Sequence, residues 1–375
     1  MKRRSSPLTE HLKSVDYFVL FSALGMTALG VLTLAGAANV LGTRYAILQA
    51  ATAGAGLIAA FVISLFDYEE VVNRLWLPFS ILSVGLIVAV ILFGTSPDGS
   101  QNNWIAIPGV PFNIQPSEFV KITFVMVYAK HISVVRDRIN KITSVIGLAL
   151  HAGVIFGLLL ISGDLGSALV YVAIAAVMLY AGGLSLWYFA AAALVIVVAF
   201  PYIWPHLDEY QQMRILCGFN PELDPVKYGY NAIMSRKAIS AGGFRGAGLD
   251  GGTVWPQVPI AYADFLYCVL AEKLGFFGTA AYMVLMAVMI VRLIVLARRA
   301  RKSMGSLIIM GFAAMMIAQA VENIGMCLAM LPVVGITLPF FSYGGSSMLS
   351  MYLSLGVIES IASHNVKYYF EREER

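Results

Sequence analysis

Charged residues are scarce in this chain. Of its 375 residues, only 12% are Asp, Glu, Lys or Arg, whereas 59% are hydrophobic. Soluble globular domains carry about 25% charged residues, so the composition argues against a soluble protein and indicates a membrane protein with many spans. The net charge of +4 does not indicate a nucleic-acid partner, because the basic residues lie in segments between apolar runs.

The signatures of several enzyme classes are also missing. The three cysteines, Cys217, Cys268 and Cys327, have no CxxC spacing, which argues against a disulfide framework and against a zinc site. The five histidines show no metal-ligand spacing, and neither HExxH nor GxSxG occurs. Zinc-dependent and serine-dependent hydrolysis are therefore not expected.

Long apolar runs dominate instead. A helix needs about 17–25 predominantly apolar residues to cross a bilayer, and the chain has ten such runs. They lie near 16–38, 46–66, 75–94, 116–133, 143–162, 165–183, 185–204, 263–296, 304–326 and 342–362. The only long connection, 205–262, follows the seventh run. We therefore predict one all-α polytopic membrane domain over residues 1–375, with ten transmembrane helices and a large loop between helices 7 and 8.

The distribution of Lys and Arg predicts the orientation. With the N-terminus inside, the inner segments carry most of the basic residues, including Lys2, Arg3 and Arg4. The outer side then carries Arg44 and the basic residues of 205–262, and long loops contribute little to the positive-inside rule. Both termini are therefore predicted to be cytoplasmic, and 205–262 is predicted to be extracytoplasmic.

A single carboxylate marks the junction between the long loop and the eighth run. Residues 242–278 change from a Gly-rich polar stretch into an apolar helix, and Asp264 lies where the two meet. At about 1.5 Å per residue, counting back from Arg292 through a core of about 30 Å places Asp264 roughly two turns outside the hydrocarbon. A helix break at Gly275 or Gly278 would change that count.

Asp264 is interpreted as a general base, because a lone ionisable group beside an apolar span is costly and usually functional. The structural alternative is a helix N-cap. Its predicted position on the outer surface implies a lipid-linked substrate that carries its own activation, since ATP is absent there.

Two further positions combine charge with apolar runs. Glu118 and Lys121 are three residues apart, on one helix face, and can form an ion pair. They act either as a structural pair or as charges that line a cavity. Asp164 precedes the sixth run, where it serves either as an N-cap or as a cavity carboxylate beside Lys121.

The long loop also carries cations that could bind phosphate oxygens. The candidates are Arg214, Arg236, Lys237 and Arg245. Solvated surface charge is the alternative for each of them.

Two prolines and a Gly-Gly pair interrupt the apolar region 331–347. Non-helical backbone at membrane depth occurs only inside protein or against a water-filled cavity. This region therefore predicts a cavity lining, with a kink or close helix packing as the alternative. The candidate lining residues are Ser342, Gly344, Gly345 and Ser346.

Several motifs taken together resemble the SEDS family, the RodA/FtsW/SpoVE peptidoglycan polymerases. In chain order they are NNWIAI, QPSEFVKI, DLGSALV, RILCGFNPELDP, YGYNAI, AISAGGFRGAGL, ADFLYCVLAEKLGFFG and GITLPFFSYGGSSM. The resemblance implies a ten-helix fold with a large outer loop between helices 7 and 8, in the bacterial inner membrane. It also implies glycosyltransfer from lipid II and a class B penicillin-binding protein, a transpeptidase, as partner.

The resemblance also assigns residues. It makes Asp264 the catalytic residue and matches Glu118, Lys121, Asp164 and Arg214 to family motifs. The chain departs from the family pattern at several positions. They are Gly163, Asn231, Ile260, Tyr262, Ala263 and Lys273.

The resulting hypothesis is a peptidoglycan glycan-strand polymerase. It transfers lipid II-linked disaccharide units to a growing chain with inversion, and Asp264 removes the proton from the acceptor hydroxyl. The loop cations stabilise the leaving diphosphate, and a divalent cation, Mg or Mn, near Asp264 is left open. The other hypotheses are a lipid II flippase or polyprenol-linked transporter and a non-catalytic scaffold for a transpeptidase. The expected partners also include the nascent glycan strand and membrane lipids.

Overall fold

The computed structural model describes residues 14–96, 102–106 and 113–370. The basic residues Lys2, Arg3 and Arg4, which support the predicted orientation, lie outside these ranges. Within them, eight helices are long and apolar enough to cross a membrane. These helices are α2 (Tyr17–Gly36), α4 (Arg44–Ser64), α5 (Tyr68–Phe93), α7 (Ile142–Ile161), α8 (Leu165–Gly182), α9 (Leu186–Ile203), α12 (Leu266–Arg299) and α13 (Ser303–Cys327). The prediction of an all-α polytopic membrane protein is therefore confirmed.

Two more long helices occupy predicted apolar runs without being among those eight. They are α6 (Pro116–Val135) and α14 (Gly345–Phe370). α6 contains Glu118, Lys121 and Lys130, which lower its apolar character. α6 is nevertheless one of the more buried helices, because it packs against α5, α8, α13 and α14.

Carboxylate caps explain where α2 and α5 begin. Asp16 accepts a hydrogen bond from the backbone N–H of Val19 at the start of α2, at 3.3 Å. Asp67 caps α5 in the same way, and the first turn of α5 contains two glutamates. Acidic residues in a first turn favour the positive end of the helix dipole. α5 therefore begins at Tyr68, well before the apolar run predicted from residue 75.

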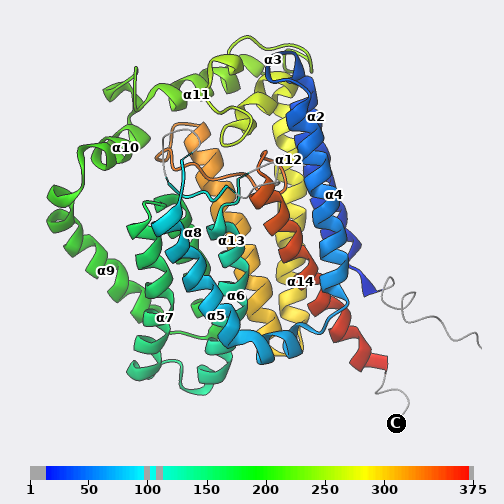
Figure 1. Cartoon of the computed structure of the whole chain (residues 1–375), viewed down its shortest axis with the longest axis vertical. Coiled ribbons are helices and arrows are strands. Elements are labelled where there is room, and N and C mark those ends of the chain that lie inside the picture. The colour runs from blue at the N-terminus through cyan, green and yellow to red at the C-terminus, as the bar shows by residue number, and fades with distance from the viewer. Residues whose placement is uncertain (1–13, 97–101, 107–112, 371–375) are drawn as a thin grey trace, which may run out of the picture.

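The long helices pack side by side, and the 205–262 connection lies across one end of the bundle (Figure 1). This connection contains α10 (Glu209–Phe219) and α11 (Tyr230–Gly242). The start of α2 and the end of α14 lie at the opposite end. A short helix, α3 (Ala38–Leu41), follows α2 near α11. The two ends of the bundle therefore differ, and the irregular segments described below lie near α10 and α11.

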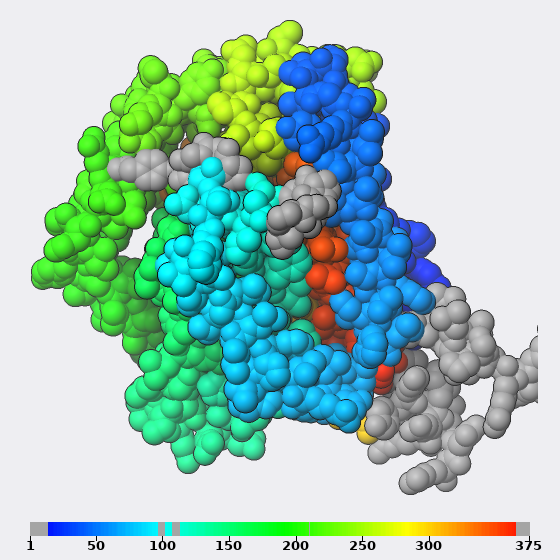
Figure 2. Space-filling model, in the orientation of Figure 1, coloured from blue at the N-terminus to red at the C-terminus, as the bar shows by residue number. Residues whose placement is uncertain are grey.

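Helix α9 lies at the edge of the bundle. No residue of α9 is buried, and a gap separates part of this green segment from the rest of the surface in Figure 2. Its side chains include exposed Leu194, Val195 and Ile196. Such a surface is compatible with hydrocarbon rather than with water as solvent.

The eighth predicted run is not one continuous helix. Gly275 interrupts α12 with φ 64° and ψ −155°, a conformation that favours glycine. The backbone approaches closely here, since a Cβ on Gly275 would lie 2.6 Å from the carbonyl oxygen of Phe244. The backbone N–H of Phe276 donates to the carbonyl of Gly243 at 2.9 Å. The Gly-rich end of the long loop therefore packs into the break in α12.

The segment between α13 and α14 is irregular, in agreement with the prediction for residues 331–347. Its carbonyl groups are satisfied by side chains from other helices. Gln49 donates to the carbonyls of Phe341 and Ser342 at 3.2 and 2.9 Å, and the Tyr282 hydroxyl donates to Pro339 at 3.2 Å. These bonds remove the cost of burying a non-helical backbone.

Candidate functional site

A cleft of about 630 Å³ lies among α10, α11 and the segments that precede α12 and α14. Its volume is within the range of about 300–1,000 Å³ that is usual for ligand sites. The wall contains five of the residues proposed from the sequence. These residues are Asp164, Arg214, Asp264, Gly344 and Gly345.

Asp264 lies in a turn just before α12. Phe265 is the N-cap of that helix, so the alternative in which Asp264 caps the helix is wrong. The buried amide of Asn323 donates hydrogen bonds to the carbonyls of Asp264 and Ile336, both at 2.7 Å. Asn323 therefore fixes the Asp264 backbone against the segment that precedes α14, while the Asp264 side chain lines the cleft.

Gly335 leaves room beside the Asp264 carboxylate. A Cβ on Gly335 would lie 3.4 Å from Asp264 Oδ2, and the φ of +73° at Gly335 favours glycine. The sequence analysis did not select Gly335, because its proximity to Asp264 depends on two segments that are distant in the chain.

Three cationic residues line the same cleft. Arg214 was proposed from the sequence, whereas Arg44 and Lys227 were not. The Arg214 guanidinium donates from Nε to the carbonyl of Val333 at 3.0 Å, and its Nη2 donates to the same oxygen. A hydrogen bond with the Tyr228 side chain raises the pKa of Lys227, so Lys227 carries its charge at neutral pH. The cleft therefore combines the carboxylates of Asp164 and Asp264 with three cations.

The other three proposed loop cations lie elsewhere. Arg236 forms an ion pair with Glu222 at 3.0 Å, and both side chains are exposed. Lys237 and Arg245 are also exposed, and none of the three lines this cleft. Their proposed contacts with a diphosphate stay predictions.

Three tyrosines form an aromatic cluster in the cleft wall. The ring of Tyr45 lies 4.4 Å from that of Tyr262 and 4.9 Å from that of Tyr343, between centroids. Burial, together with the neighbouring Tyr45, raises the pKa of Tyr262 to about 12, so its hydroxyl stays protonated at neutral pH. The cluster joins three distant parts of the chain, and the sequence pattern gave no signal for it.

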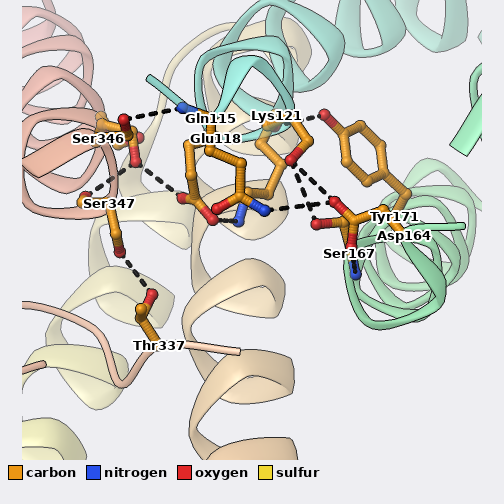
Figure 3. Close-up of polar contacts among 12 residues, drawn as sticks. Gln115, Glu118, Lys121, Asp164, Ser167, Tyr171, Thr337, Ser346 and Ser347 are labelled. Carbon is orange, nitrogen blue, oxygen red and sulfur yellow. Dashed lines mark hydrogen bonds and ion pairs between the residues drawn. The ribbon is translucent and has the colours of Figure 1, made fainter. Parts of the chain in front are cut away.

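A buried polar network supports the floor of the cleft (Figure 3). Lys121 Nζ lies 2.7 Å from Glu118 Oε1, and both side chains are almost fully buried. The Ser350 hydroxyl donates to the other oxygen of Glu118 at 3.1 Å. The structural ion pair proposed for Glu118 and Lys121 is therefore present.

Asp164 belongs to the same network and has two roles. It caps α8 by accepting a hydrogen bond from the backbone N–H of Ser167 at 3.0 Å. The Ser117 hydroxyl and the Gln115 amide also donate to it, at 3.1 and 3.4 Å. Because Asp164 also lines the cleft, both of its proposed roles have a structural basis.

The first turn of α14 is attached to this network, and the irregular segment before it has its own side-chain hydrogen bond. Ser346 accepts a hydrogen bond from the backbone N–H of Gln115 at 3.0 Å (Figure 3). Ser342 is buried and accepts from the backbone N–H of Leu338 at 3.0 Å. Among the proposed residues, Gly344 and Gly345 therefore line the cleft, whereas Ser342 and Ser346 hold its wall in place.

Glu272 and Lys273 fasten the long loop to the bundle. The Glu272 carboxylate accepts three hydrogen bonds from the backbone N–H groups of residues 253–255, at 2.6–3.0 Å. The Lys273 ammonium group donates to three carbonyl groups. The acceptors are Gly36, Leu249 and Gly251, at 3.0, 2.6 and 3.0 Å. The lysine that departs from the family pattern therefore links the loop to the end of α2.

The fold and the cleft define a multi-pass, all-helical membrane protein with a charged and aromatic site at one end of its bundle. The chain belongs to the FtsW/RodA/SpoVE family, since the family model, described as "Cell cycle protein", matches residues 13–367. The resemblance stated from the sequence motifs is thus confirmed.

Curated relatives and solved structures agree with this assignment. The chain is 31% identical to the probable peptidoglycan glycosyltransferase FtsW of Trichlorobacter lovleyi, over 94% of each protein. It is 35% identical to the peptidoglycan glycosyltransferase MrdB of Escherichia coli K12, over 77% of this chain and 78% of MrdB. A chain of a peptidoglycan synthase complex, whose structure concerns coordination of polymerization and crosslinking, aligns with TM-score 0.81 and 27% identity over 94% of this chain and 98% of that one. RodA of Thermus thermophilus aligns with TM-score 0.69 and 25% identity, over 93% and 96%.

Proposed function

We propose that this protein is a peptidoglycan glycosyltransferase that polymerises lipid II-linked disaccharide units into glycan strands. The observation that carries the proposal is the position of Asp264 in a cleft that also contains Arg44, Arg214 and Lys227. A glycosyl transfer from a diphosphate needs a base for the acceptor and positive charge for the leaving group. The names of the relatives support the same reaction.

The proposed reaction is a single displacement with inversion. The acceptor sugar hydroxyl attacks the anomeric carbon of the donor, its proton passes to the Asp264 carboxylate, and the bond from that carbon to the diphosphate oxygen breaks. One carboxylate is sufficient for this step, because no covalent glycosyl-enzyme intermediate forms. The undecaprenyl diphosphate then leaves with both electrons of the broken bond.

The cations of the cleft stabilise the negative charge on the departing diphosphate. Arg214 keeps a fixed orientation through its two hydrogen bonds to Val333, so it is positioned before the substrate binds. Arg44 and Lys227 add charge in the same space. A Mg or Mn ion is the alternative source of charge; Asp264 would hold it, and it would supply positive charge for the diphosphate. In the part of the chain that the structure describes, no group of three or more His, Cys, Asp or Glu side chains could hold a metal ion, so substrate oxygens would complete the coordination.

The tyrosine cluster provides a surface for sugar rings. Tyr45, Tyr262 and Tyr343 are partly exposed and line the cleft beside Asp264. An aromatic ring gives a saccharide a large apolar face, and each phenol adds a hydrogen-bonding hydroxyl. We therefore propose that this cluster binds the acceptor sugar next to the base.

The proposed topology follows the charge distribution. We propose that α6 and α14 complete ten spans, that both termini are cytoplasmic in the bacterial inner membrane, and that 205–262 is extracytoplasmic. The cleft then opens toward the outer surface, where the substrate is already activated by its diphosphate. A class B penicillin-binding protein is the proposed partner, supported by the similarity to a chain of a synthase complex that links polymerization to crosslinking.

The decisive experiment compares purified wild-type protein with Asp264→Ala, using lipid II with and without the transpeptidase partner. Loss of a general base lowers the rate by about 10²–10⁴-fold, whereas Glu222→Ala, which removes an exposed carboxylate outside the cleft, is expected to leave the rate unchanged. Addition of EDTA separates the two sources of charge, because only a metal-dependent reaction stops. Polymer formation at the wild-type rate by folded Asp264→Ala would exclude this mechanism.

The same experiment separates the other hypotheses. A flippase moves labelled lipid II across liposomes without forming polymer. The charges Glu118, Lys121 and Asp164 and the broken segment 332–345 suited a transport path. Glu118 and Lys121 are buried and bonded to each other, whereas Asp164 and part of 332–345 line the cleft that contains Asp264. A scaffold is indicated if Asp264→Ala complements a depleted strain.

A further inference from the structure

A second cleft lies between α5, α6 and α7. Its volume is about 500 Å³, and it shares no residue with the cleft that contains Asp264. Trp76, Thr123, Phe124, Lys130 and His151 are among its lining residues. Nothing in the proposed glycosyl transfer uses this cleft.

The second cleft opens on the lateral surface of the bundle. Two of its lining residues, Val134 and Val154, have relative exposures of 68% and 50%. Both belong to helices that run through the apolar part of the protein, where hydrocarbon replaces water as the solvent. A groove that opens on this surface is filled by an apolar chain rather than by a soluble metabolite.

The two ends of this cleft differ, since one has a charged group and the other has a pair of hydroxyl groups. At about 1.5 Å per residue, Lys130 lies about 8 Å along the axis from Val135, the end of α6, whereas Thr123 lies about 18 Å away. The Thr123 hydroxyl is hydrogen bonded to the Ser83 hydroxyl at 2.7 Å, so these two groups already have a partner within the protein. Apolar Phe124, together with the valines of α6 and α7, forms the wall between these two ends.

The end of the groove near Val135 presents a cation, Lys130, and an aromatic ring, Trp76. Lys130 Nζ lies 5.3 Å from the centroid of the Trp76 ring and donates to the carbonyl of Asn73 at 3.3 Å. An ammonium group has three donors, so this bond leaves capacity for a phosphate oxygen. Tryptophan and lysine together are typical of the boundary between hydrocarbon and head groups. This end is also the one predicted to face the cytoplasm.

Two histidines, His131 and His151, also line the groove. His131 Nδ1 and His151 Nδ1 lie 3.1 Å apart, so one ring donates to the other. The facing nitrogens of this pair therefore have a partner within the protein. Phe124 and Val127, between Thr123 and Lys130, give the groove its apolar wall.

We propose that this cleft binds an anionic phospholipid of the inner leaflet, with its phosphate at Lys130 and one acyl chain along the groove toward Thr123. The inner leaflet carries anionic head groups, and a basic residue near that surface attracts them. The charge at one end and the apolar wall above it match the two parts of such a lipid. This inference does not depend on the reaction at Asp264.

The lipid would join α5, α6 and α7 at the inner half of the bundle. α6 also carries Glu118 and Lys121, close to the floor of the first cleft. A bound lipid therefore stabilises the helix that supports the first cleft, without touching that cleft.

The test titrates the purified full-length protein with phosphatidylglycerol and with phosphatidylcholine of the same acyl chains, and measures bound lipid by native mass spectrometry. One lysine near an anionic surface contributes about a fivefold change in affinity. Lys130→Gln is therefore expected to weaken phosphatidylglycerol binding about fivefold and to weaken phosphatidylcholine binding less, because the choline ammonium group neutralises the charge of that phosphate. Lys141→Gln, at an exposed lysine outside both clefts, is the matched control.

A second variant tests the groove itself. Val154→Trp places a large ring in the exposed wall and is expected to reduce binding of both lipids. Thermal unfolding provides the independent measurement, because a ligand that binds only the folded state raises its melting temperature. Phosphatidylglycerol should raise this temperature in wild-type protein and in Lys141→Gln, and much less in Lys130→Gln.

Three outcomes would overturn the proposal. The first is equal binding of the two lipids, and the second is an unchanged affinity in Lys130→Gln. The third is displacement of phosphatidylglycerol by undecaprenyl phosphate at equal concentration, which would assign the groove to a prenyl chain.

Discussion

The buried ion pair between Glu118 and Lys121 gives the sharpest prediction of stability. The two charged atoms are 2.7 Å apart, and their side-chain exposures are 4% and 0%. Removal of one partner from such a pair leaves an uncompensated buried charge, which costs about 3–5 kcal/mol. Lys121→Met should therefore destabilise the protein by that amount, since Glu118 keeps the Ser350 hydroxyl, 3.1 Å away, but loses its counter-charge.

The double variant Glu118→Gln/Lys121→Met removes both charges. Replacement of a buried pair by neutral groups of similar size is often close to neutral, so this variant should be more stable than Lys121→Met by at least about 2 kcal/mol. The coupling energy is the change in the double variant minus the sum of the changes in the two single variants, Glu118→Gln and Lys121→Met. Titration with sodium dodecyl sulfate in mixed micelles, followed by circular dichroism, measures the free energy of unfolding of all four proteins. Lys237→Met, at an exposed lysine, controls for the loss of a positive charge.

The reasoning fails if the two single losses add up in the double variant. Additive losses mean that the two side chains stabilise the protein independently, and that the short distance does not reflect an energetic pair. An additive result would also direct attention to the neighbouring Asp164 as the true counter-charge of Lys121.

Three further predictions use the same unfolding assay. Gly275→Ala should destabilise the protein by more than about 2 kcal/mol, because φ is +64° and a Cβ would lie 2.6 Å from the Phe244 carbonyl oxygen. Gly85→Ala, inside α5 with open space around it, should instead stabilise the protein by about 0.5–1 kcal/mol. Equal effects of the two substitutions would contradict the break in α12. Asp164→Ala should cost about 1–3 kcal/mol through loss of the α8 cap and of the Ser117 hydrogen bond, and a loss below about 0.5 kcal/mol would contradict both roles. Burial raises the pKa of Tyr262 from 10.0 to about 12, so the folded state holds this proton more tightly and stability falls as pH rises from about 10 to 12. Tyr262→Phe should reduce that slope, and an unchanged slope would show that another group titrates.

Local patterns in the sequence predicted much of the helical framework. Apolar length located the long helices, and the i, i+3 spacing of Glu118 and Lys121 predicted their ion pair, because both signals depend only on neighbouring residues. The same holds for the cap at Asp164 and for the irregular segment near Pro339. The start of α5 was predicted too late, since its first turn is polar and apolar length gives no signal there.

The walls of the cleft could not be predicted in the same way. Arg44, Tyr45 and Lys227 reach Asp264 only after α4, the long loop and α12 have packed together, and no short-range pattern encodes that packing. The role of Glu272 and Lys273 was missed for the same reason, because their partners are backbone groups of the long loop and α2. Conversely, Arg236 and Arg245 were proposed together with Arg214 because all three are cations of the long loop, and the fold places only Arg214 in the cleft.

Helix α9 buries none of its residues, and this has a consequence for how the gene can vary. A side chain that touches only lipid tails has no neighbour of fixed shape to match, so any apolar replacement of Leu194 or Val197 meets an equivalent environment. Selection on this helix therefore acts on the hydrophobicity of its side chains and on its length, rather than on which apolar residue occupies each position. Related chains should show here a nearly random exchange among Leu, Ile, Val and Phe, beside strict retention of Asn323 and Gly335.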